Sequence, residues 1–524
     1  MSSSRALARA GLIVSGAFLV SRLLGWVRVL IIGNTFPAGP ELDAFLAAFR
    51  LPDLMFQLVA AGALSSAVIP VVSALLATDE TARAWRVVST IANMMLVGLL
   101  VLGVIVFIAA PLIVPTIIAP GWDDARWART VELTRIMILS PIFLSLGSLA
   151  SSVLNARGRF AASAIAPIVY NLAIIGAALL LTPAFGVTGL AIGVVAGSLG
   201  HLLVQVGPLR AQGYRYDPEI ELEDPEARKA LRLMAPRALG LGAGQITFVV
   251  LNSIASTIGT GAVSVFYVAF TLLQIPIGVI GVPLGVVVLP SLSREAAIGH
   301  LDEFAGLMSR AIRLTLFVML PITGISIVLR HEIVGVLFGY SRFDAAALDL
   351  TAATLLTFLT GLTAHALIAI LARAFYARQD TRTPVAAAIL AVVINSTLAA
   401  VLAGPLGLPG LGLAIAIAAW VETIVLLVLL RRSLPELAFR PLLSLGLRSL
   451  AVTIGGSLAA AGVEAGLTLA LGADPGRFGL VVRIVVVGTV WLLTSAALAL
   501  VLRISELPSM IGLMLDLIRR PRRA

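Results

Sequence analysis

Cysteine is absent from this chain of 524 residues, and a single lysine, Lys229, stands among its 37 basic residues. Without thiols the chain forms no disulfide and offers no Cys-ligated metal site. Its four histidines are scattered without metal-ligand spacing, and no GxxxxGK[ST] phosphate-binding loop occurs. The sequence therefore predicts a protein without a metal or cofactor that does not itself hydrolyse ATP.

Charged residues are also scarce, at 12% of the chain against about 25% in an ordinary soluble protein. Hydrophobic residues make up 59%, and the mean hydropathy is +1.05. This composition indicates a membrane protein with no room for a large soluble domain. The formal net charge of +10 resembles that of nucleic-acid-binding proteins. In a membrane protein, however, loop arginines set the topology, so we expect no nucleic-acid partner.

Apolar runs of membrane-spanning length occur fourteen times along the chain. At about 1.5 Å per residue, each can cross a hydrocarbon core of roughly 30 Å. The first follows the positive segment MSSSRALARA and contains arginine, so we expect an uncleaved helix instead of a signal peptide. The sequence predicts an all-α polytopic membrane protein with fourteen transmembrane helices, at residues 11–32, 44–72, 87–115, 131–154, 160–182, 187–208, 232–257, 264–290, 308–329, 350–375, 384–403, 409–430, 445–470 and 478–502.

The positions of the basic residues agree with this helix count. With the N-terminus in the cytoplasm, 26 of the 37 fall in cytoplasmic segments, 5 fall in outer loops and the other 6 lie within helices. The positive-inside rule predicts such an excess of cytoplasmic arginine. We therefore expect both termini in the cytoplasm.

Stretches in the first half of the chain recur in the second half at one constant offset. LNARGRFAASAIAPIVYNL (154–172) resembles FYARQDTRTPVAAAILAVV (375–393), and FGVTGLAIG (185–193) resembles LGLPGLGLA (406–414). This offset spans six helices and predicts two parallel six-helix repeats, which indicate an alternating-access transporter, not an enzyme, with its site between the repeats. The predicted parts are an N-lobe at 1–208, a cytoplasmic connection at 209–231, a C-lobe at 232–431, two C-terminal helices at 432–504 and a basic amphipathic tail at 505–524.

Two arginines interrupt the first predicted helix, within SRLLGWVR at residues 21–28. A charged side chain at the bilayer centre costs about 2.5–3.5 kcal/mol on the insertion scale, so Arg22 and Arg28 are functional candidates. Arg22 shares a helix face with Trp26, whereas Arg28 lies about 240° around the helix from Arg22. Either both arginines line a wide cavity, or Arg28 extends to an interface while Arg22 faces the cavity.

Further charges follow in ELDAFLAAFRLPDL, residues 41–54. Asp43 either lies at the outer mouth of the cavity or complements the dipole at a helix N-terminus. Arg50 and Asp53 are three residues apart and can pair with each other. A cavity with two or three arginines and few acids favours an anionic substrate, because guanidinium groups bind phosphate oxygens bidentately.

The motifs SRLLGWVR, DAFLAAFRLPDL, AGALSSAVIPV and GVPLGVVVLPSLSRE resemble the MurJ (MviN) family of lipid II flippases, part of the multidrug/oligosaccharidyl-lipid/polysaccharide exporter superfamily. The resemblance covers essentially the whole chain. It implies transport of a lipid-linked peptidoglycan precursor from the inner to the outer leaflet of the bacterial inner membrane. Arg22, Arg28 and Asp43 stand at positions that the family needs. The resemblance places the substrate's pyrophosphate among the arginines and its polyprenyl tail along the last two helices.

The chain departs from the family at several charged positions. Val29 stands where the family has an acid, and Phe56 stands where it has an arginine. Thr271 and Gln274 replace an arginine and a glutamate in the eighth helix, and the turn at 60–63 lacks an acid. Because positive and negative side chains are lost together, no charge is left in the membrane without a partner. These departures leave the identity of the substrate open.

Arg237, in the seventh helix, has no counterpart in the family pattern. It either supplies a replacement cavity charge or extends to the cytoplasmic face. The predicted substrate-binding set is Ser21, Arg22, Trp26, Arg28, Asp43, Arg50, Gln57, Arg237, Thr271 and Gln274.

The resemblance predicts a lipid II flippase, with three alternatives: a flippase for another polyprenyl-linked glycan, a multidrug cation antiporter, and a non-transporting scaffold for envelope enzymes. Expected partners are a polyprenyl-pyrophosphate-linked substrate and membrane lipids, with cell-wall synthesis enzymes as further candidates. The protein is expected to act as a monomer.

Overall fold

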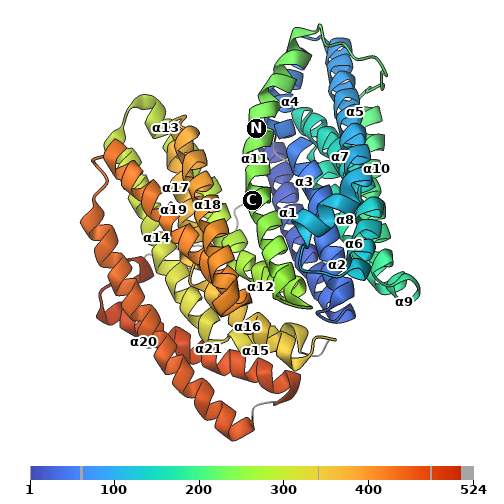
Figure 1. Ribbon diagram of the computed structural model, residues 1–524. Helices are drawn as coiled ribbons and strands as arrows, with labels where there is room; N and C mark the ends of the chain where they lie inside the picture. Colours follow the sequence, from blue (N-terminus) through green and yellow to red (C-terminus); the bar gives the residue numbers. More distant parts are fainter. Residues whose placement is uncertain (1, 60–62, 340–341, 473–474, 509–524) are drawn as a thin grey trace. The chain divides into compact units, whose positions relative to one another are not determined.

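The computed structural model describes residues 2–59, 63–339, 342–472 and 475–508, and the regular secondary structure in these residues is helical (Figure 1). The chain forms two compact units, Met1–Ser264 and Val265–Ala524. The predicted tail at 505–524 lies mostly outside the described residues. The helices of the first unit are α1 (Ser2–Thr35), α2 (Pro40–Ala48), α3 (Arg50–Val59), α4 (Ala63–Ala77), α5 (Thr81–Ile113), the π-helix η1 (Val114–Ile118), α6 (Asp124–Met137), α7 (Leu139–Ala156), α8 (Phe160–Leu180), α9 (Thr182–Phe185), α10 (Val187–Ala211) and α11 (Pro225–Ile258).

The second unit continues the same all-helical architecture. Helix α12 (Ala262–Pro276) begins in the first unit and runs into the second. The other helices of the second unit are the π-helix η2 (Ile277–Gly281), α13 (Val282–Ile298), α14 (Leu301–Val328), α15 (Arg330–Phe338), α16 (Ala345–Leu359), α17 (Leu362–Ala377), α18 (Arg382–Leu406), α19 (Leu408–Ser433), α20 (Phe439–Leu471) and α21 (Gly476–Val501).

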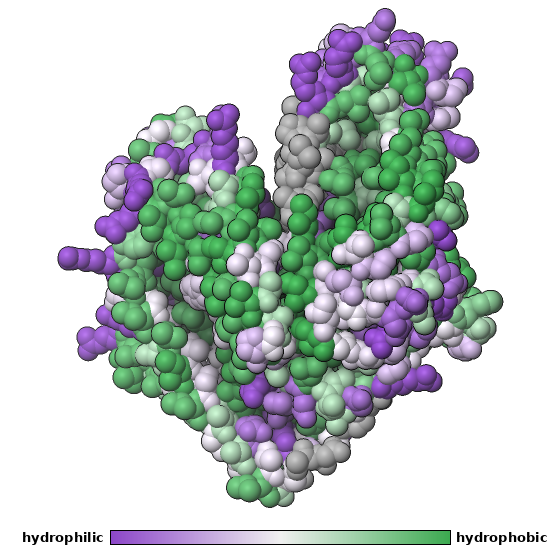
Figure 2. Space-filling view, in the orientation of Figure 1, coloured by the Kyte–Doolittle hydropathy of each residue, from purple (hydrophilic) through white to green (hydrophobic). Residues whose placement is uncertain are grey.

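The described residues contain ten helices long and apolar enough to cross a membrane, or eleven if the bent pair α16 and α17 forms one span. The predicted count of fourteen is therefore not confirmed. Helices α1 and α11, at the first and seventh predicted spans, are each 34 residues long. In Figure 2, hydrophobic residues cover the flanks of each unit and hydrophilic residues gather at helix ends, as expected for a protein surrounded by lipid.

The second predicted span, at 44–72, is broken into α2, α3 and α4. Pro52 explains the first break, because proline has no N–H to donate to the carbonyl oxygen four residues earlier, that of Ala48. The hydroxyl of Thr134 on α6 donates to this Ala48 oxygen at 3.4 Å. Inside a membrane, a neighbouring helix must satisfy a carbonyl that proline leaves unpaired, and here α6 does so.

The predicted repeat is visible in the backbone of each unit. Gly186 and Gly407, at equivalent positions of the repeat, have nearly the same dihedral angles, with φ of 56° and 61° and ψ of −141° and −140°. Each precedes a helix, α10 or α19. Gly158 and Gln379 are also equivalent in the repeat, and both have positive φ, at 69° and 61°. The offset found in the sequence thus corresponds to two copies of the same pair of turns, one in each unit.

The connection after α10 is an ordered segment that packs along α5. The Tyr216 hydroxyl donates to Oδ1 of Asn93 at 2.6 Å, and Nδ2 of Asn93 donates to the backbone oxygens of Asp217 and Glu219. At the end of the segment, Asp224 caps the N-terminus of α11 by accepting from the N–H groups of its second and third residues. The polar side chains on one face of α5 therefore hold this segment in place.

Candidate functional site

The two arginines of the first helix lie on α1, which packs against α8. The guanidinium carbon of Arg28 lies 5.8 Å from the centroid of the Tyr170 ring on α8, a cation–π contact. Nδ2 of Asn171, the next residue of α8, donates to the backbone oxygen of Ser21 at 3.4 Å. Arg22 and Arg28 are both half-buried. Helix α8 therefore supports both ends of the SRLLGWVR segment, which indicates a fixed position for its charges.

Asp43 lies in the first turn of α2 and is fully buried. One carboxylate oxygen accepts from the N–H of Gly261 at 2.7 Å. The other accepts from the N–H of Ser264 at 2.8 Å and from its hydroxyl at 2.5 Å. The acid thus satisfies donors at the N-terminus of α12, where amide hydrogens carry partial positive charge. Its partners belong to another helix, and none of these hydrogen bonds goes to a predicted cavity arginine.

The backbone at Gly261 permits this arrangement. Its φ is +82°, and a Cβ atom there would come within 2.8 Å of the backbone oxygen of Ala38. A side chain at this position would be strained and would separate the α11–α12 turn from the loop before α2. Glycine therefore lets the two segments approach closely enough for Asp43 to reach Ser264.

Arg50 begins α3, and its side chain reaches α11. Its Nε donates to Oδ1 of Asn252 at 3.4 Å, and its guanidinium carbon lies 5.7 Å from the Phe248 ring centroid. Asp53 lies close enough to Arg50 to be stabilised by its charge, and it shares a hydrogen bond with Gln57. Arg50, Asp53 and Gln57 thus form one polar group where α3 packs on α11.

Asn252 connects this group to the segment after η1. Its Nδ2 donates to the backbone oxygen of Ile118 at 2.9 Å, and the N–H of Gly121 donates to the Ser256 hydroxyl at 3.3 Å. A Cβ on Gly121 would lie 2.5 Å from the Ser256 backbone oxygen. The polar face of α11 formed by Asn252 and Ser256 was not predicted from the sequence. The sequence pattern that could have predicted this face is a pair of polar residues four positions apart within an apolar run.

The remaining predicted residues lie elsewhere in the chain. Thr271 and Gln274 are on α12 in the second unit, where the Thr271 hydroxyl donates to the Tyr267 backbone oxygen at 2.8 Å and Gln274 is exposed. The side chain of Arg237 lies outside the described residues. Trp26 is half-buried on α1. Within the first unit, the contacts described above involve Ser21, Arg28, Asp43, Arg50 and Gln57, and their assignment to substrate binding stays a prediction.

Two positions that depart from the family pattern are apolar contacts in this fold. Phe56 packs against a buried cluster built from α4, α5 and α7, whose members include Val88, Leu149 and Val153. Val29 is buried on α1, with 8% of its surface exposed. An arginine at position 56 would place a charge beside this apolar cluster without a partner there, which is costly. Phe56 therefore contributes packing, and no charge, at this position.

A comparison with known protein families matches residues 32–473 to the family described as lipid II flippase MurJ. The chain belongs to the MurJ family. A probable lipid II flippase MurJ of Rhizobium tropici is 34% identical over 428 residues, covering 80% of each chain. The lipid II flippase MurJ of Burkholderia cenocepacia is 32% identical over 431 residues, covering 81% of this chain and 84% of its own.

Solved structures agree with this membership in the MurJ family. A lipid II flippase MurJ in an inward closed conformation matches with a TM-score of 0.77 and 23% identity, covering 93% of this chain and 99% of the other. An inward-facing multidrug resistance transporter of the MATE family matches with a TM-score of 0.65 and 19% identity, covering 80% of this chain and 95% of the other. At these identities the likeness concerns the fold. The resemblance to the MurJ family found in the sequence is confirmed by the family match and by these relatives.

Proposed function

We propose that the chain is a lipid II flippase that moves its substrate from the inner to the outer leaflet by alternating access. The observation that carries the proposal is the match of residues 32–473 to the MurJ family, and the contact of Arg28 with Tyr170 on α8 adds to it. The helical fold shared with MurJ and MATE structures supports a transporter that alternates between conformations. We place the protein in the bacterial inner membrane as a monomer, with both termini in the cytoplasm.

Arg22 and Arg28 are the proposed partners of the substrate's pyrophosphate. Guanidinium groups bind phosphate oxygens bidentately and keep their charge at any physiological pH. The Tyr170 ring beside Arg28 offers a contact that holds a cation without neutralising it, so Arg28 keeps its positive charge for an anionic ligand. Arg50 is a weaker candidate, because Asn252 and Phe248 already contact its guanidinium group.

Asp43 has a different proposed role. Its carboxylate oxygens are occupied by three donors at the start of α12, so it is a poor substrate ligand in this conformation. We infer that these hydrogen bonds hold the loop before α2 against the α11–α12 turn. Transport then requires them to break and form again in each cycle. An essential Asp43 would thus act on conformation, and its removal would affect the rate of transport more than substrate affinity.

Complementation of a bacterium depleted of its own lipid II flippase tests the proposal. The full-length chain should restore growth, and Arg22→Ala should abolish rescue at equal expression. Arg432→Ala is the matched control, because Arg432 is an exposed arginine in the last turn of α19. Growth restored by a chain lacking both Arg22 and Arg28 would overturn the proposed mechanism.

The same assay separates the alternatives. Failure to rescue, together with resistance to cationic drugs, would indicate a multidrug antiporter, whose fold this chain shares. Failure to rescue without drug resistance would fit a non-transporting scaffold for cell-wall synthesis enzymes. If the chain fails to restore growth but exports another polyprenyl-linked glycan, it is a flippase for that glycan. This outcome would fit the residues that depart from the family pattern, Val29, Phe56, Thr271 and Gln274.

A further inference from the structure

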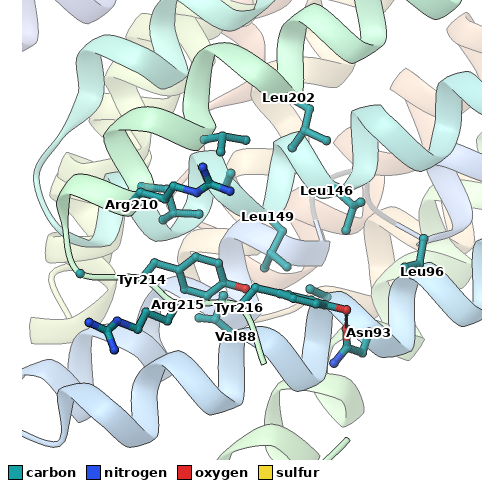
Figure 3. Close-up of a pocket in the computed structure, with 15 residues that line it drawn as sticks. Val88, Asn93, Leu96, Leu146, Leu149, Leu202, Arg210, Tyr214, Arg215 and Tyr216 are labelled. Carbon is teal, nitrogen blue, oxygen red and sulfur yellow. Dashed lines mark hydrogen bonds between the residues drawn. The ribbon is translucent and has the colours of Figure 1, made fainter. Parts of the chain in front are cut away.

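A pocket of about 730 Å³ lies in the first unit, away from the α1 arginines (Figure 3). It is bounded by α5, α7 and α10 and by the segment Gly213–Tyr216 that follows α10. The predicted substrate residues are on α1, α2, α3, α11 and α12, and none of them lines this pocket. The proposed transport function therefore leaves the pocket without a role.

The walls of the pocket are apolar over most of their length. Leu96 comes from α5, Leu146 and Leu149 come from α7, and Leu202 and Val206 come from α10. Figure 3 shows these leucines extending from Arg210 at one end to Leu96 at the other. Leu202 and Arg210 are eight residues apart on one helix, or about 12 Å along its axis. The pocket is thus long enough for part of an acyl chain.

The pocket borders surface that faces the surrounding lipid. Val97 and Leu100 on α5 are 49% and 47% exposed, and Leu203 on α10 is 57% exposed. Each lies next to or within one turn of a pocket residue, Leu96 or Leu202. Because exposed aliphatic side chains on membrane-spanning helices contact lipid, the chains of the bilayer can enter the pocket directly from its side.

Arg210 provides a positive charge at one end of the pocket. It lies in the last turn of α10, is exposed, and makes no ion pair among the described residues. Arg215 also lines the pocket, although its guanidinium group points away from the leucines in Figure 3. The pocket therefore combines a cation at one end with an aliphatic trough, the pattern of a site for an anionic amphiphile.

The rings of Tyr214 and Tyr216 form one wall of the pocket, along its length from Arg210 to the leucines. The Tyr214 hydroxyl lies 3.1 Å from the Ser89 hydroxyl, and the Tyr216 hydroxyl donates to Asn93 at 2.6 Å. Trp85 packs edge-on against Tyr214, with ring centroids 5.6 Å apart. Because their hydroxyl groups are already bonded to α5, the tyrosines offer a ligand mainly their ring faces. The site is preorganised, which lowers the entropic cost of binding.

We propose that this pocket binds an anionic phospholipid of the cytoplasmic leaflet, with the phosphate at Arg210 and one acyl chain along Leu202 and Leu146. The placement in that leaflet rests on the proposed topology, in which the α10–α11 connection is cytoplasmic. Basic pockets between helices on the cytoplasmic side are typical sites for anionic headgroups. A free phosphate has no use for the aliphatic trough, so the pocket favours a lipid over a soluble anion.

Native mass spectrometry of the delipidated full-length chain in detergent tests this site. The probe is dioleoyl phosphatidylglycerol, with dioleoyl phosphatidylcholine as the neutral-headgroup comparison. Arg210→Gln should weaken phosphatidylglycerol binding about tenfold, as expected for a lost charge-assisted hydrogen bond. Leu202→Trp should abolish binding by filling the trough, and Arg210→Lys should keep most of it.

Two variants serve as matched controls. Leu180→Trp adds the same bulk to a lipid-facing position of α8 that does not line the pocket, and Arg432→Gln removes an arginine from the last turn of α19. Both should bind phosphatidylglycerol within about twofold of the parent chain.

Three results would overturn the lipid site: unchanged binding in both Arg210→Gln and Leu202→Trp, equal affinity for phosphatidylcholine, or displacement of phosphatidylglycerol by millimolar glycerol 3-phosphate. The last would indicate a soluble phosphate ligand. The measurement uses no transport substrate, so its failure is distinct from a failure to rescue growth.

Discussion

The carboxylate of Asp43 and the start of α12 are joined through Ser264, which donates to one carboxylate oxygen from both its N–H, at 2.8 Å, and its hydroxyl, at 2.5 Å. Hydrogen bonds to a charged acceptor contribute about 1.5–3 kcal/mol each. This relationship joins two segments that are distant in the sequence and gives a buried acid a structural role.

Asp43→Asn should impair both stability and transport, because an amide offers one acceptor oxygen where the carboxylate offers two. The amide nitrogen would face an N–H group of Gly261 or Ser264, leaving buried donors unpaired. We expect a loss of about 1.5–3 kcal/mol in the free energy of unfolding and no rescue of a flippase-depleted strain. Ser264→Ala keeps the N–H donor and removes one bond, so a smaller loss should follow. Equal effects of the two substitutions would contradict this account.

Gly261→Ala should destabilise the α11–α12 turn, because it combines a positive φ with a Cβ only 2.8 Å from the Ala38 backbone oxygen. Backbone strain of this kind costs about 1–3 kcal/mol. Gly259→Ala is the control two residues away, since its backbone is extended and a Cβ there meets nothing within 4 Å. Thermal unfolding of the purified variants measures the difference. A melting temperature lowered equally by both variants would show that neither strain nor the contact matters.

Tyr170→Leu should weaken the support of Arg28, because it removes the aromatic face that lies 5.8 Å from the guanidinium carbon. A cation–π contact contributes about 0.5–2 kcal/mol, so transport should fall roughly twofold to thirtyfold. Tyr170→Phe keeps the ring face and should retain most activity. The assay is lipid II translocation in proteoliposomes at matched protein content. Leucine and phenylalanine variants with the same rate would show that the ring does not position Arg28.

The α10–α11 connection should loosen in acid. Burial raises the pKa of Asp224, but the hydrogen bonds from Arg83 at 2.7 Å and from the N–H groups of Ala227 and Glu226 outweigh burial and hold the pKa below its ordinary value. A depressed pKa in the folded protein adds stability above the unfolded pKa, and this stability is lost as the pH falls through the folded one. The α10–α11 connection should therefore stay packed against α5 at neutral pH, and this packing should weaken below about pH 4.

Hydrogen exchange of residues 213–224 measures this docking, with α10 as an internal reference. Asp224→Asn keeps an oxygen to cap α11 but loses the ion pair with Arg83, so the segment should exchange faster at pH 7 and lose most of its pH dependence. A pH dependence that persists in Asp224→Asn would assign the effect to another acid, such as Glu80 or Glu221, which pair with Arg83 and Arg86.

The sequence by itself determined the class of protein, and it named the arginines that the candidate site is built on. Long apolar runs can form only helices in lipid, because every backbone polar group must be bonded internally. Arginines inside such runs are costly enough to mark a function, which identified Arg22 and Arg28. The repeat between the two halves of the chain could also be recognised in the sequence. The structure shows it as backbone turns of the same conformation at Gly186 and Gly407.

Only the tertiary structure decided which partners the polar groups take. Asp43 was expected at a cavity mouth or at a helix end, and the fold gave it donors on α12. Arg50 was a possible partner of Asp53, and the fold adds contacts of its guanidinium group with Asn252 and Phe248 on α11. A sequence specifies the faces of its helices through periodicity, but hydrogen-bond partners depend on how close two helices come, and Gly261 and Gly121 set those approaches through contacts distant in the chain.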